Sequence, residues 1–489
     1  MRKFDTKVQY LKYKVLREVA KHAWEGDLLE SITDIPKELV PGPKPSMRCC
    51  IYKERAVLTE RIKMAMGGNK DNHNVIEVID IACDECPSAG YTVTDSCRGC
   101  LAHRCEDVCK FDALTFDENH VAHIDKSKCK NCGACAKVCP FGAIIDKVRP
   151  CRNACKADAI SFGEYGEAKI DDDKCTACGA CVYKCPWGAI VDKSYILDVI
   201  EMLKGGRQDI GFGAEENPDN NKLPRVYAVI APAISSQFVY AHLGQIVTGL
   251  KKLGFYKVVE AALGADMVAA TESKELAEKG EVMSSCCPAF VSYVKKAFPD
   301  LAPYVSSSLS PMAAVAKYIK ELHPTSKVVF IGPCTAKKME MQLPNVAPYV
   351  DSVITFEELQ ALFDSRDIDI TTLEERPLYD ASAFGRGFAK CGGLSEAVAE
   401  GLKEQGFTDF DLRPVTCNGL EECKVALLKA TRNLNGANFI EGMACVGGCV
   451  GGAGCLTHSE KNKAFVATFS DAAKEDSIIE SVQDAEERI

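Results

Sequence analysis

Two stretches decide how the first half of this chain folds: CKNCGACAKVCPFGAI at residues 129–144 and CTACGACVYKCPWGAI at residues 175–190. Both have the spacing Cys-x2-Cys-x2-Cys-x3-Cys-Pro, and they are offset by about 46 residues. Matching segments precede them, CKFDALTF at residues 109–116 and CKADAISF at residues 155–162. Repetition at this level predicts two copies of one small structural unit between residues 91 and 193.

The cysteine spacing resembles that of bacterial ferredoxins, in which three close thiolates bind one 4Fe–4S cluster and the fourth reaches the neighbouring cluster. The run Cys97-x2-Cys100-x4-Cys105-x3-Cys109 is a looser version of the same motif. The crossing rule gives three quartets among the sixteen cysteines of this region, and the upstream pair Cys83 and Cys86 could complete a fourth with the two cysteines that remain. The expected quartets are Cys97, Cys100, Cys105 and Cys139; Cys109, Cys129, Cys132 and Cys135; Cys155, Cys175, Cys178 and Cys181; and Cys83, Cys86, Cys151 and Cys185.

The last of these quartets has an alternative. Cys83 and Cys86 form a CxxC pair that could instead bind zinc or act as a separate redox pair. We therefore expect three to four accessory 4Fe–4S clusters.

Composition supports this interpretation of the cysteines. The chain has 489 residues, 47% of them hydrophobic and 26% charged, and its net charge of -10 argues against a nucleic-acid partner. No apolar stretch is long enough to span a membrane, and the opening MRKFDTKVQYLKYK lacks the apolar core of a secretory signal. We expect a cytoplasmic protein without a membrane partner, in which 27 cysteines indicate iron–sulfur chemistry rather than disulfides.

The pattern predicts a multidomain protein of the α+β or α/β class. Residues 1–90 form a helical region with an amphipathic helix and the CxxC pair, residues 91–193 a ferredoxin-like domain, and residues 194–489 an α/β domain. A Gly- and Asn-rich stretch at residues 205–224 is expected to be a loop or linker. Two short apolar runs, VYAVIAP and KVVFIGP, are expected to be buried parallel strands, with Cys334 just beyond the end of the second.

Nine further cysteines occur after residue 285, several of them in three motifs: SSCCPAF (284–290), GPCTAKKME (332–340) and EGMACVGGCVGGAG (441–454). Four separated thiolates can bind one further cubane, and glycines beside them let the backbone approach a bulky inorganic group. The positive charge of Lys337 could stabilise an anionic ligand there.

In this order, the three motifs resemble the signature segments of [FeFe]-hydrogenases, and most closely those of the monomeric group B enzymes. The resemblance covers roughly residues 194–489. It implies an H-cluster, which consists of a 4Fe–4S cubane and a di-iron unit with CO, cyanide and azadithiolate. The implied cubane ligands are Cys287, Cys334, Cys445 and Cys449, with Cys449 also bridging to the di-iron unit.

The resemblance assigns roles to further residues. Cys286 corresponds to the thiol that passes protons to the dithiolate, and Lys337 to the residue that hydrogen-bonds a cyanide. Alignment of the segment LGADMVAATESKE implies a proton relay through Glu272, Ser306 and Glu275. The implied pocket residues are Ala231, Pro232, Ala233, Lys337, Glu340 and Met443.

Without the resemblance, the two relay glutamates would be read as a solvated helix face. Lys337 and Glu340 would likewise be read as a surface ion pair.

The chain departs from the family pattern at several positions. Gly332 replaces a methionine, Phe290 a tryptophan and Met312 a glutamine, while Cys455 and Leu456 replace Gln-Pro. The cluster ligands themselves are intact, so the expected H2 chemistry is unaffected. The changes bear instead on catalytic bias, oxygen tolerance and inhibitor affinity. The cysteines without an assigned role are Cys49, Cys50, Cys391, Cys417, Cys423 and Cys455.

The expected function is reversible H2 oxidation and proton reduction, with electrons passing through the accessory clusters to ferredoxin or a similar soluble carrier. Maturation proteins would have to supply the di-iron unit. One alternative is a hydrogenase-like cluster-assembly factor, although such relatives lack the equivalents of Cys286 and Lys337. The other is an H2 sensor, although sensors of this family usually carry a PAS-type domain, for which we see no segment.

Overall fold

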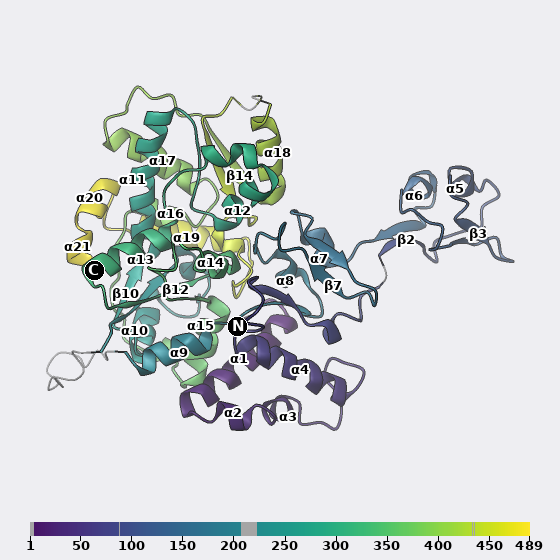
Figure 1. Ribbon diagram of the computed structural model, residues 1–489, viewed down its shortest axis with the longest axis horizontal. Coiled ribbons are helices and arrows are strands. Elements are labelled where there is room, and N and C mark those ends of the chain that lie inside the picture. The colour runs from purple at the N-terminus through teal and green to yellow at the C-terminus, as the bar shows by residue number, and fades with distance from the viewer. Residues whose placement is uncertain (1–3, 88, 207–222, 433, 435) are drawn as a thin grey trace.

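The computed structural model describes residues 4–87, 89–206, 223–432, 434 and 436–489. Figure 1 shows a broad body with a narrow arm, formed by β2, β3, α5 and α6, that projects from one side. Most of the Gly- and Asn-rich stretch predicted to be a loop lies outside the described residues. No helix in the described parts of the chain combines the length and the apolar character needed to cross a bilayer.

The N-terminal region is a layer of helices: α1 (Lys7–Glu25), α2 (Leu28–Ser31), α3 (Ile35–Leu39) and α4 (Ile51–Ala65). A capping box of Thr6 and Gln9 begins α1, and Gly26 ends it in the left-handed conformation. The predicted amphipathic face buries Val15, Leu16 and Val19. Because α1 packs against α15 of the C-terminal domain, this region is part of the body.

The two sequence repeats fold as two similar units, each with an antiparallel strand pair and short helices. The strands are β1 (Ile76–Val78), β2 (Gly90–Val93), β3 (Leu114–Phe116), β4 (Ala122–Ile124), β5 (Ile144–Lys147), β6 (Ile160–Phe162), β7 (Ala168–Ile170) and β8 (Ile190–Asp192). The helices are η1 (Asp80–Ala82), α5 (Arg104–Asp107), α6 (Ala134–Val138), α7 (Pro150–Ala154) and α8 (Ala180–Lys184).

Pairing between these strands defines the arm and its base. Strand β3 pairs with β4 and β6 pairs with β7, one pair in each unit. Strand β2 pairs with β5 where the arm leaves the body. Strand β1 pairs with β8, so the segment before residue 90 completes the inner ferredoxin-like unit rather than belonging only to the helical layer.

The C-terminal domain contains two parallel sheets. The first has the order β10 (Lys257–Glu260), β9 (Val226–Ile230), β12 (Lys327–Gly332), β13 (Ser352–Thr355). The second has the order β11 (Val282–Met283), β15 (Phe439–Met443), β14 (Pro414–Asn418). The two predicted buried strands are β9 and β12, which pair in parallel with Val229 opposite Phe330.

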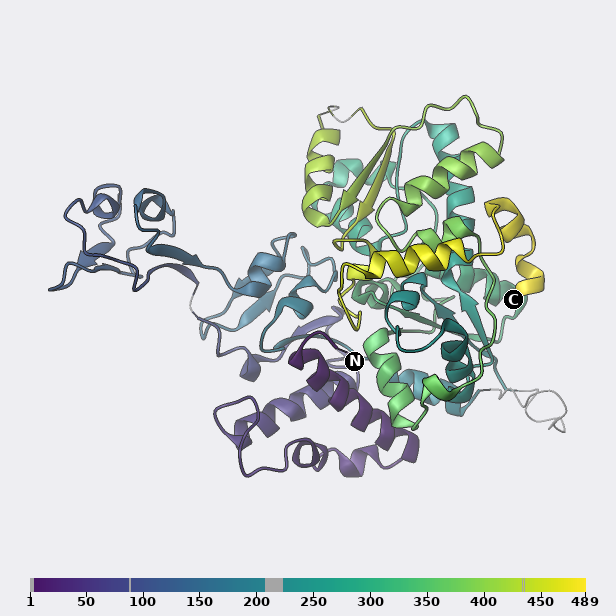
Figure 2. The ribbon, with the colours of Figure 1, turned by 180° about the vertical axis from the view of Figure 1, so that it is seen from behind.

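Helices surround both sheets, and α11 with its many buried residues lies at the centre of the domain. Figure 2 shows α19 lying between the part of the domain that contains the first sheet and the part that contains the second sheet. The helices are α9 (Ile196–Lys204), α10 (Leu243–Leu253), α11 (Ala261–Lys279), α12 (Pro288–Ala297), α13 (Pro311–Leu322), α14 (Thr335–Glu340), α15 (Phe356–Ser365), α16 (Ala383–Gly387), α17 (Gly393–Glu404), α18 (Leu420–Ala430), α19 (Asn462–Asp471), α20 (Ile478–Gln483) and α21 (Ala485–Arg488). The described part of the domain also contains the 3-10 turns η3 (Pro232–Ser236), η4 (Pro299–Tyr304), η5 (Ile370–Thr372) and η6 (Cys449–Gly451).

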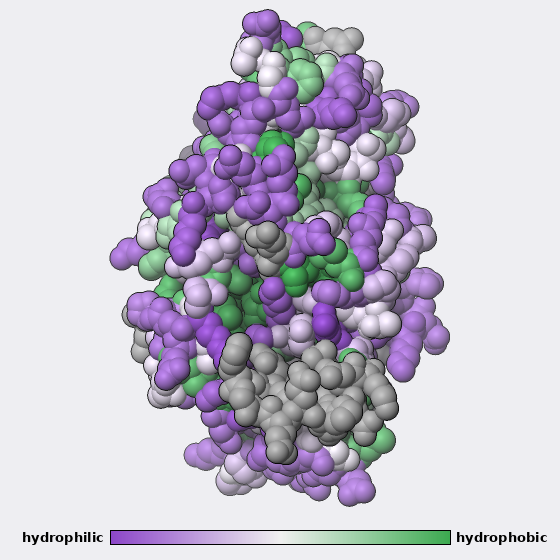
Figure 3. All heavy atoms as spheres, turned by 90° about the vertical axis from the view of Figure 1, so that its left-hand side faces the viewer, coloured by the Kyte–Doolittle hydropathy of each residue, from purple (hydrophilic) through white to green (hydrophobic). Residues whose placement is uncertain are grey.

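The face of the body opposite the arm carries mostly polar side chains. Figure 3 views this face and shows hydrophilic residues over most of it, interrupted by small apolar areas. The cysteine groups lie inside the body and along the arm.

Candidate cluster-binding sites

The carboxyl ends of three parallel strands bring four distant cysteines to one cavity of about 90 Å³. Cys287 follows β11, Cys334 follows β12, and Cys445 and Cys449 follow β15. Other residues at its wall include Ala231, Pro232, Cys286, Met312, Phe330, Lys337, Phe388 and Met443. Apart from Lys337, these neighbours are apolar or sulfur-containing, so the cavity excludes water and presents thiols.

Local backbone structure explains how the ligand loops reach the cavity. Cys287 and Cys334 are the N-cap residues of α12 and α14, with Pro288 at the first position of α12. Gly448 has a φ of 89°, which favours glycine. A Cβ on Gly452 would lie 2.4 Å from the carbonyl oxygen of Pro333, so the last ligand loop must be glycine-rich to pack beside the Cys334 loop.

The buried thiols need a cationic partner to ionise. Burial raises the pKa of Cys334 and of Cys449 to about 12, and raises the pKa of Cys445 well above its usual value. As thiolates these groups would be stable only when bound to metal, which supplies the missing positive charge. The four sulfurs therefore fit an iron–sulfur cubane.

The predicted pocket residues divide into two groups. Ala231, Pro232, Lys337 and Met443 line the cavity, whereas Ala233 is buried in η3 and is not among the lining residues. Glu340 also lies outside the cavity wall, where its Oε2 is 2.7 Å from Lys337 Nζ. The two charged groups form a buried pair, and Lys337 Nζ lies 3.5 Å from the carbonyl oxygen of Cys286.

The predicted relay residues lie side by side at the edge of this site. Glu272 Oε1 accepts hydrogen bonds from the amide and the hydroxyl of Ser285, at 2.8 and 2.7 Å. Ser306 Oγ donates to Glu275 Oε2 at 2.6 Å, and Lys279 Nζ binds Glu275 Oε1 at 2.5 Å. Since Lys279 is half-exposed, the row runs from the buried residue next to Cys286 to the surface.

The two carboxyl groups differ in electrostatic environment. Burial raises the pKa of Glu272 to about 7, and its Oε2 has no hydrogen-bond partner. Burial also acts on Glu275, but hydrogen bonds from Lys279 and Ser306 hold its pKa below the usual value. Thus the inner carboxyl group can gain or lose a proton near neutral pH, while the outer one is held ionised.

Sequence reasoning missed two members of this row, Ser285 and Lys279. Ser285 belongs to the SSCCPAF motif, yet nothing in the motif shows that its hydroxyl faces a carboxylate from α11. Lys279 follows Glu275 by four residues, which is the spacing of a helical ion pair and could have been found.

The accessory cysteines of the arm converge as the crossing rule predicts. Cys97, Cys100, Cys105 and Cys139 line one cavity in the arm, and Cys109, Cys129, Cys132 and Cys135 line another. The thiol of Cys181 interacts electrostatically with Cys155, Cys175 and Cys178, and also with Cys151. The thiol of Cys151 interacts in the same way with Cys83, Cys86 and Cys185, so these eight cysteines lie near one another, and their division into two quartets stays a prediction.

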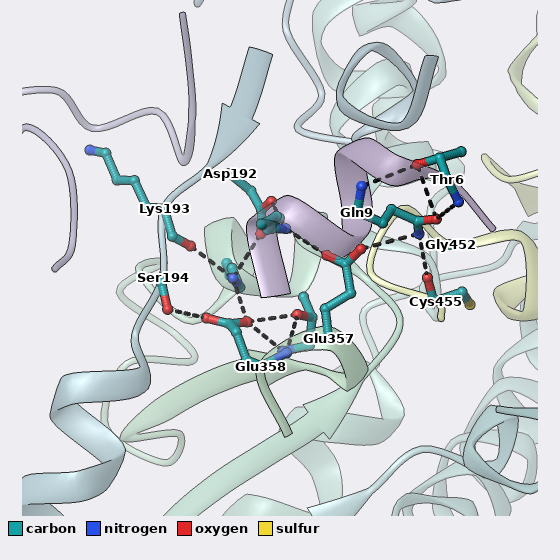
Figure 4. Close-up of polar contacts among 12 residues, drawn as sticks. Thr6, Gln9, Asp192, Lys193, Ser194, Glu357, Glu358, Gly452 and Cys455 are labelled. Atoms are coloured by element: carbon teal, nitrogen blue, oxygen red, sulfur yellow. Dashed lines mark hydrogen bonds and ion pairs between the residues drawn. The ribbon is translucent and has the colours of Figure 1, made fainter. Parts of the chain in front are cut away.

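A buried network of charges joins the helical layer, the ferredoxin-like unit and the C-terminal domain (Figure 4). Lys338 Nζ lies 2.8 Å from Asp192 Oδ2 and 2.7 Å from Glu358 Oε2. Lys12 of α1 bridges Asp192 and Glu357, at 2.5 and 2.7 Å. The sequence analysis assigned no role to this part of the molecule.

The same network reaches the end of the last ligand loop. Gln9 of α1 donates to Glu357 Oε1 at 3.1 Å and to the carbonyl oxygen of Cys455 at 3.0 Å. Ser194 donates to Glu358 Oε1 at 2.5 Å. Helix α1 therefore contacts both the ferredoxin-like unit, through Asp192, and the C-terminal domain, through Glu357 and Cys455.

Two positions that depart from the family pattern, Gly332 and Phe290, are tightly packed against neighbouring residues. A Cβ on Gly332 would lie 2.5 Å from the ring of Phe330, which lines the cavity. The ring of Phe290 packs on Gly442, where a Cβ would lie 2.2 Å from it. Phe330 thus fills part of the space that a side chain at position 332 would need.

The unassigned cysteines are not at the cavity wall. Cys423 Sγ donates to the carbonyl oxygen of Met443 at 3.7 Å, and Cys455 Sγ donates to that of Val450 at 3.4 Å. Cys417, Cys423 and Cys455 are buried, Cys50 and Cys391 are half-buried, and Cys49 is exposed.

Comparison with known families divides the chain in the same way. Residues 224–453 match the family described as iron only hydrogenase large subunit, C-terminal domain. Residues 96–143 match a 4Fe–4S dicluster domain and residues 168–191 a 4Fe–4S binding domain. The expected fold class is confirmed: the chain combines ferredoxin-like 4Fe–4S domains with a hydrogenase-type C-terminal domain.

Individual relatives include hydrogenases. The chain is 30% identical over 278 residues to iron hydrogenase 1 of Clostridium pasteurianum, a match that covers 47% of this chain and 48% of that relative. It is 29% identical over 390 residues to the NADP-reducing hydrogenase subunit HndD of Solidesulfovibrio fructosivorans, covering 68% of this chain and 56% of the relative. The matches thus span about half the length of these curated relatives.

Other relatives bear a different name. The cytosolic Fe-S cluster assembly factor NAR1 of Eremothecium gossypii is 31% identical over 140 residues, which covers 27% of this chain and 31% of that protein. Among solved structures, [FeFe]-hydrogenase HydA1 from Chlamydomonas reinhardtii matches with a TM-score of 0.47 and 21% identity, over 59% of this chain and 93% of that chain.

Proposed function

Because the chain joins a hydrogenase-type C-terminal domain to ferredoxin-like 4Fe–4S domains, we propose that it interconverts H2 with protons and electrons at an H-cluster. One observation carries the proposal. Cys287, Cys334, Cys445 and Cys449 line a single cavity together with Cys286 and Lys337. Four ligands, a proton-carrying thiol and a fixed positive charge are what this reaction requires of the protein.

In this proposal the four cysteines would hold the cubane, and Cys449 would also hold the di-iron unit. When bound, the H-cluster would supply the iron centre at which H2 is split or formed. Lys337, buried and paired with Glu340, would stabilise an anionic ligand of that centre. The apolar wall, which includes Met312, Phe330 and Met443, keeps bulk water away from it.

Proton transfer in this proposal uses the row of side chains beside the cavity. Cys286 holds a proton at its Sγ, because burial raises the pKa of this thiol far above neutrality. Glu272 exchanges protons with the site near neutral pH, and Ser306 connects it to Glu275, whose partner Lys279 is half-exposed at the protein surface. Hydroxyl and carboxyl groups can each donate and accept, as stepwise transfer demands.

Electron transfer in this proposal follows the four accessory quartets. Cys445 of the cavity interacts electrostatically with Cys178, which makes the quartet of Cys178 the innermost one. Its Cys181 interacts with Cys151 of the next quartet, which lies at the base of the arm. The two quartets of the arm would then exchange electrons with ferredoxin or a similar soluble carrier.

A second candidate function is cluster assembly without turnover, favoured by the matches to assembly factors over part of the chain. The presence of Cys286 and Lys337 at the cavity wall supports turnover instead, because a scaffold has no need of a buried proton carrier. An H2 sensor is a third candidate and would use the same site at a much lower rate.

Infrared spectroscopy separates these functions. The full chain, produced anaerobically together with hydrogenase maturation proteins, is expected to show CO and cyanide bands and to evolve H2 from reduced ferredoxin or reduced viologen. Absent bands in protein that has its full iron content would favour the assembly function. Normal bands with very slow turnover would favour the sensor.

A further inference from the structure

Among the described residues, Arg61 is a buried cation that forms no ion pair with an acidic side chain. Its side chain comes from α4 and is 5% exposed, and its Nε has no hydrogen-bond partner. Its Nη2 donates to the carbonyl oxygen of Trp187 at 2.9 Å, and its charged neighbours are Arg48 and Cys185. Burial and the charge of Arg48 lower its pKa to about 10, which shows that the surrounding protein does not compensate its charge. By contrast, the buried Arg386 is paired with Glu260.

Two more arginines, Arg48 and Arg149, lie near the quartet of Cys83, Cys86, Cys151 and Cys185. The side chain of Arg48 is 5% exposed, its Nη2 lies 3.5 Å from the oxygen of Trp187, and its guanidinium stacks on that indole ring. Arg149 is buried and interacts electrostatically with Cys83 and Cys86. Its Nε donates to the carbonyl oxygen of Pro87 at 3.1 Å, and its ring partner is Phe162.

Acidic groups near these arginines are few and lie toward the surface. Asp84 and Glu85 approach Arg48 Nη1 to 3.7 and 4.0 Å and are partly exposed. In the described portion of the chain, no carboxylate forms an ion pair with Arg61 or Arg149. The guanidinium groups of Arg61 and Arg149 therefore lie beside the quartet of Cys83, Cys86, Cys151 and Cys185 with no ion-pair partner among the described residues. Arg48, which donates to the carbonyl oxygen of Ala82 next to Cys83 at 3.2 Å, lies beside Arg61.

The other accessory quartets have a different environment. Arg98 and Arg104 line the cavity of the outermost quartet, but both are exposed to solvent, which screens their charge. Lys130, beside the second quartet of the arm, is exposed as well. Lys296 binds the carbonyl oxygen of Cys175 at the innermost quartet and is also exposed. Buried cationic charge is concentrated at one quartet of the relay.

We propose that Arg48, Arg61 and Arg149 make the cluster bound by Cys83, Cys86, Cys151 and Cys185 the accessory cluster of highest reduction potential, where an electron rests between transfers. The inference depends on the proposed relay. A 4Fe–4S core with four thiolates is a dianion when oxidised and gains one further negative charge on reduction. Fixed positive charges stabilise the more negative state more strongly, and more so at a buried site of low dielectric constant.

The position of this quartet in the molecule indicates why a high reduction potential would be useful there. Cys86 lies four residues before β2, and Cys151 lies four residues after β5, so this quartet stands where the arm joins the body. A carrier that docks on the arm delivers single electrons, whereas the reaction at the cavity needs two. A cluster of high potential between the arm and the cavity retains the first electron until the second one arrives.

A redox titration followed by electron paramagnetic resonance tests the proposal. The full chain is produced without maturation proteins, so that it carries cubanes but no di-iron unit, and H2 turnover plays no part in the measurement. The variant C151S identifies the signal of the quartet in question. Arg61→Gln is expected to shift the reduction equilibrium of that cluster at least about tenfold toward the oxidised form, or about 59 mV for one electron. Arg149→Gln is expected to shift it in the same direction.

Two control variants show that charge is the cause. Arg61→Lys retains the charge and is expected to keep the potential within a few-fold of the wild-type equilibrium. Arg98→Gln removes an exposed arginine beside the outermost quartet and is expected to leave the identified signal unchanged. Equal shifts in Arg61→Lys and Arg61→Gln would overturn the proposal.

Two further results would also overturn it. One is an unchanged potential in both glutamine variants with full iron content. The other is a wild-type protein with iron and sulfide for only three accessory clusters, in which C151S removes none. Neither result bears on H2 turnover, which depends on the cavity and its infrared bands, so failure of this inference is distinguishable from failure of the proposed function.

Discussion

Thr335 Oγ1 donates a hydrogen bond to the carbonyl oxygen of Ala177 at 2.7 Å, and the hydroxyl is buried. Thr335 follows the cavity ligand Cys334, and Ala177 precedes Cys178 of the innermost accessory quartet. A Cβ on Gly179 would lie 2.5 Å from the same hydroxyl and from Ala453. The loops that bind two neighbouring clusters are thus in direct contact, which favours electron transfer between them.

Replacing Thr335 with valine should weaken this contact without changing the size of the side chain. The carbonyl oxygen of Ala177 then lacks its buried partner, and we expect the free energy of unfolding to fall by about 1–3 kcal/mol. Anaerobic thermal unfolding measures the loss. The matched control is Thr59→Val, whose hydroxyl donates to Arg55 on an exposed helix face. An equal shift of the melting temperature in both variants would contradict the expectation.

Replacing Cys286 with alanine should remove the inner proton carrier while the ligands remain. We expect H2 turnover to fall by about 100-fold or more, since general acid–base groups contribute on that scale. Iron content and the infrared bands should not change. Cys417→Ala is the control, because this thiol is also buried but lies on β14, away from the cavity wall. Near-normal turnover by Cys286→Ala would exclude the proposed route.

Replacing Glu272 with glutamine should change both the rate and its pH dependence. Burial raises the pKa of Glu272 from 4.5 to about 7, so the wild-type rate should vary with pH near neutrality. The variant keeps an oxygen to accept from Ser285 but has no proton to exchange, so this variation should disappear along with most of the turnover. Rate measurements between pH 5 and pH 9, with Lys274→Gln as the helix-surface control, test this expectation.

The same residue makes a prediction about stability. The folded protein holds a proton on Glu272 at a pH at which an unfolded glutamate has lost it, so the folded state binds more protons between about pH 4.5 and pH 7. The free energy of unfolding should therefore decline as the pH rises through this window, and Glu272→Gln should decline less. Melting temperatures of both proteins across the window provide the comparison, and parallel curves would speak against a raised pKa.

The cysteine pattern predicts much of the fold and of the site, because ligand spacing within a loop is a local property. The strand before Cys334 was equally predictable, since a short apolar run followed by a helical pattern is typical of a buried parallel strand. The two quartets whose cysteines line the cavities of the arm could be written down in advance because the crossing rule fixes which run supplies the fourth ligand.

Long-range side-chain partners could not be predicted in this way. Lys337 and Lys338 are adjacent in one motif, yet the first lines the cavity and the second is entirely buried against Asp192 and Glu358. A helix turns by about 100° per residue, so neighbours on α14 face different surroundings. Lys12 belongs to the amphipathic N-terminal helix, and only the packing of α1 on α15 shows that it has a buried partner in Glu357.

Lys338 leads to the last prediction. Its side chain has no exposed surface, and Asp192 and Glu358 are buried with it. Although burial alone would raise it, the ammonium groups of Lys12 and Lys338 hold the pKa of Asp192 below its usual range. Lys338→Met removes one positive charge, leaves Glu358 without its counterion and leaves Asp192 with Lys12 alone, so we expect the free energy of unfolding to fall by about 3–5 kcal/mol.

Lys317→Met is the matched control, because its ion pair with Glu321 lies on an exposed helix surface. An exposed pair contributes about 0–1 kcal/mol, so this variant should melt close to the wild type. Limited proteolysis should also show earlier cleavage between the ferredoxin-like unit and the C-terminal domain in Lys338→Met, because Asp192 belongs to the first and Glu358 to the second. If the two variants melt alike, the buried network does not hold these parts of the molecule together, and packing of α1 against α15 must do so instead.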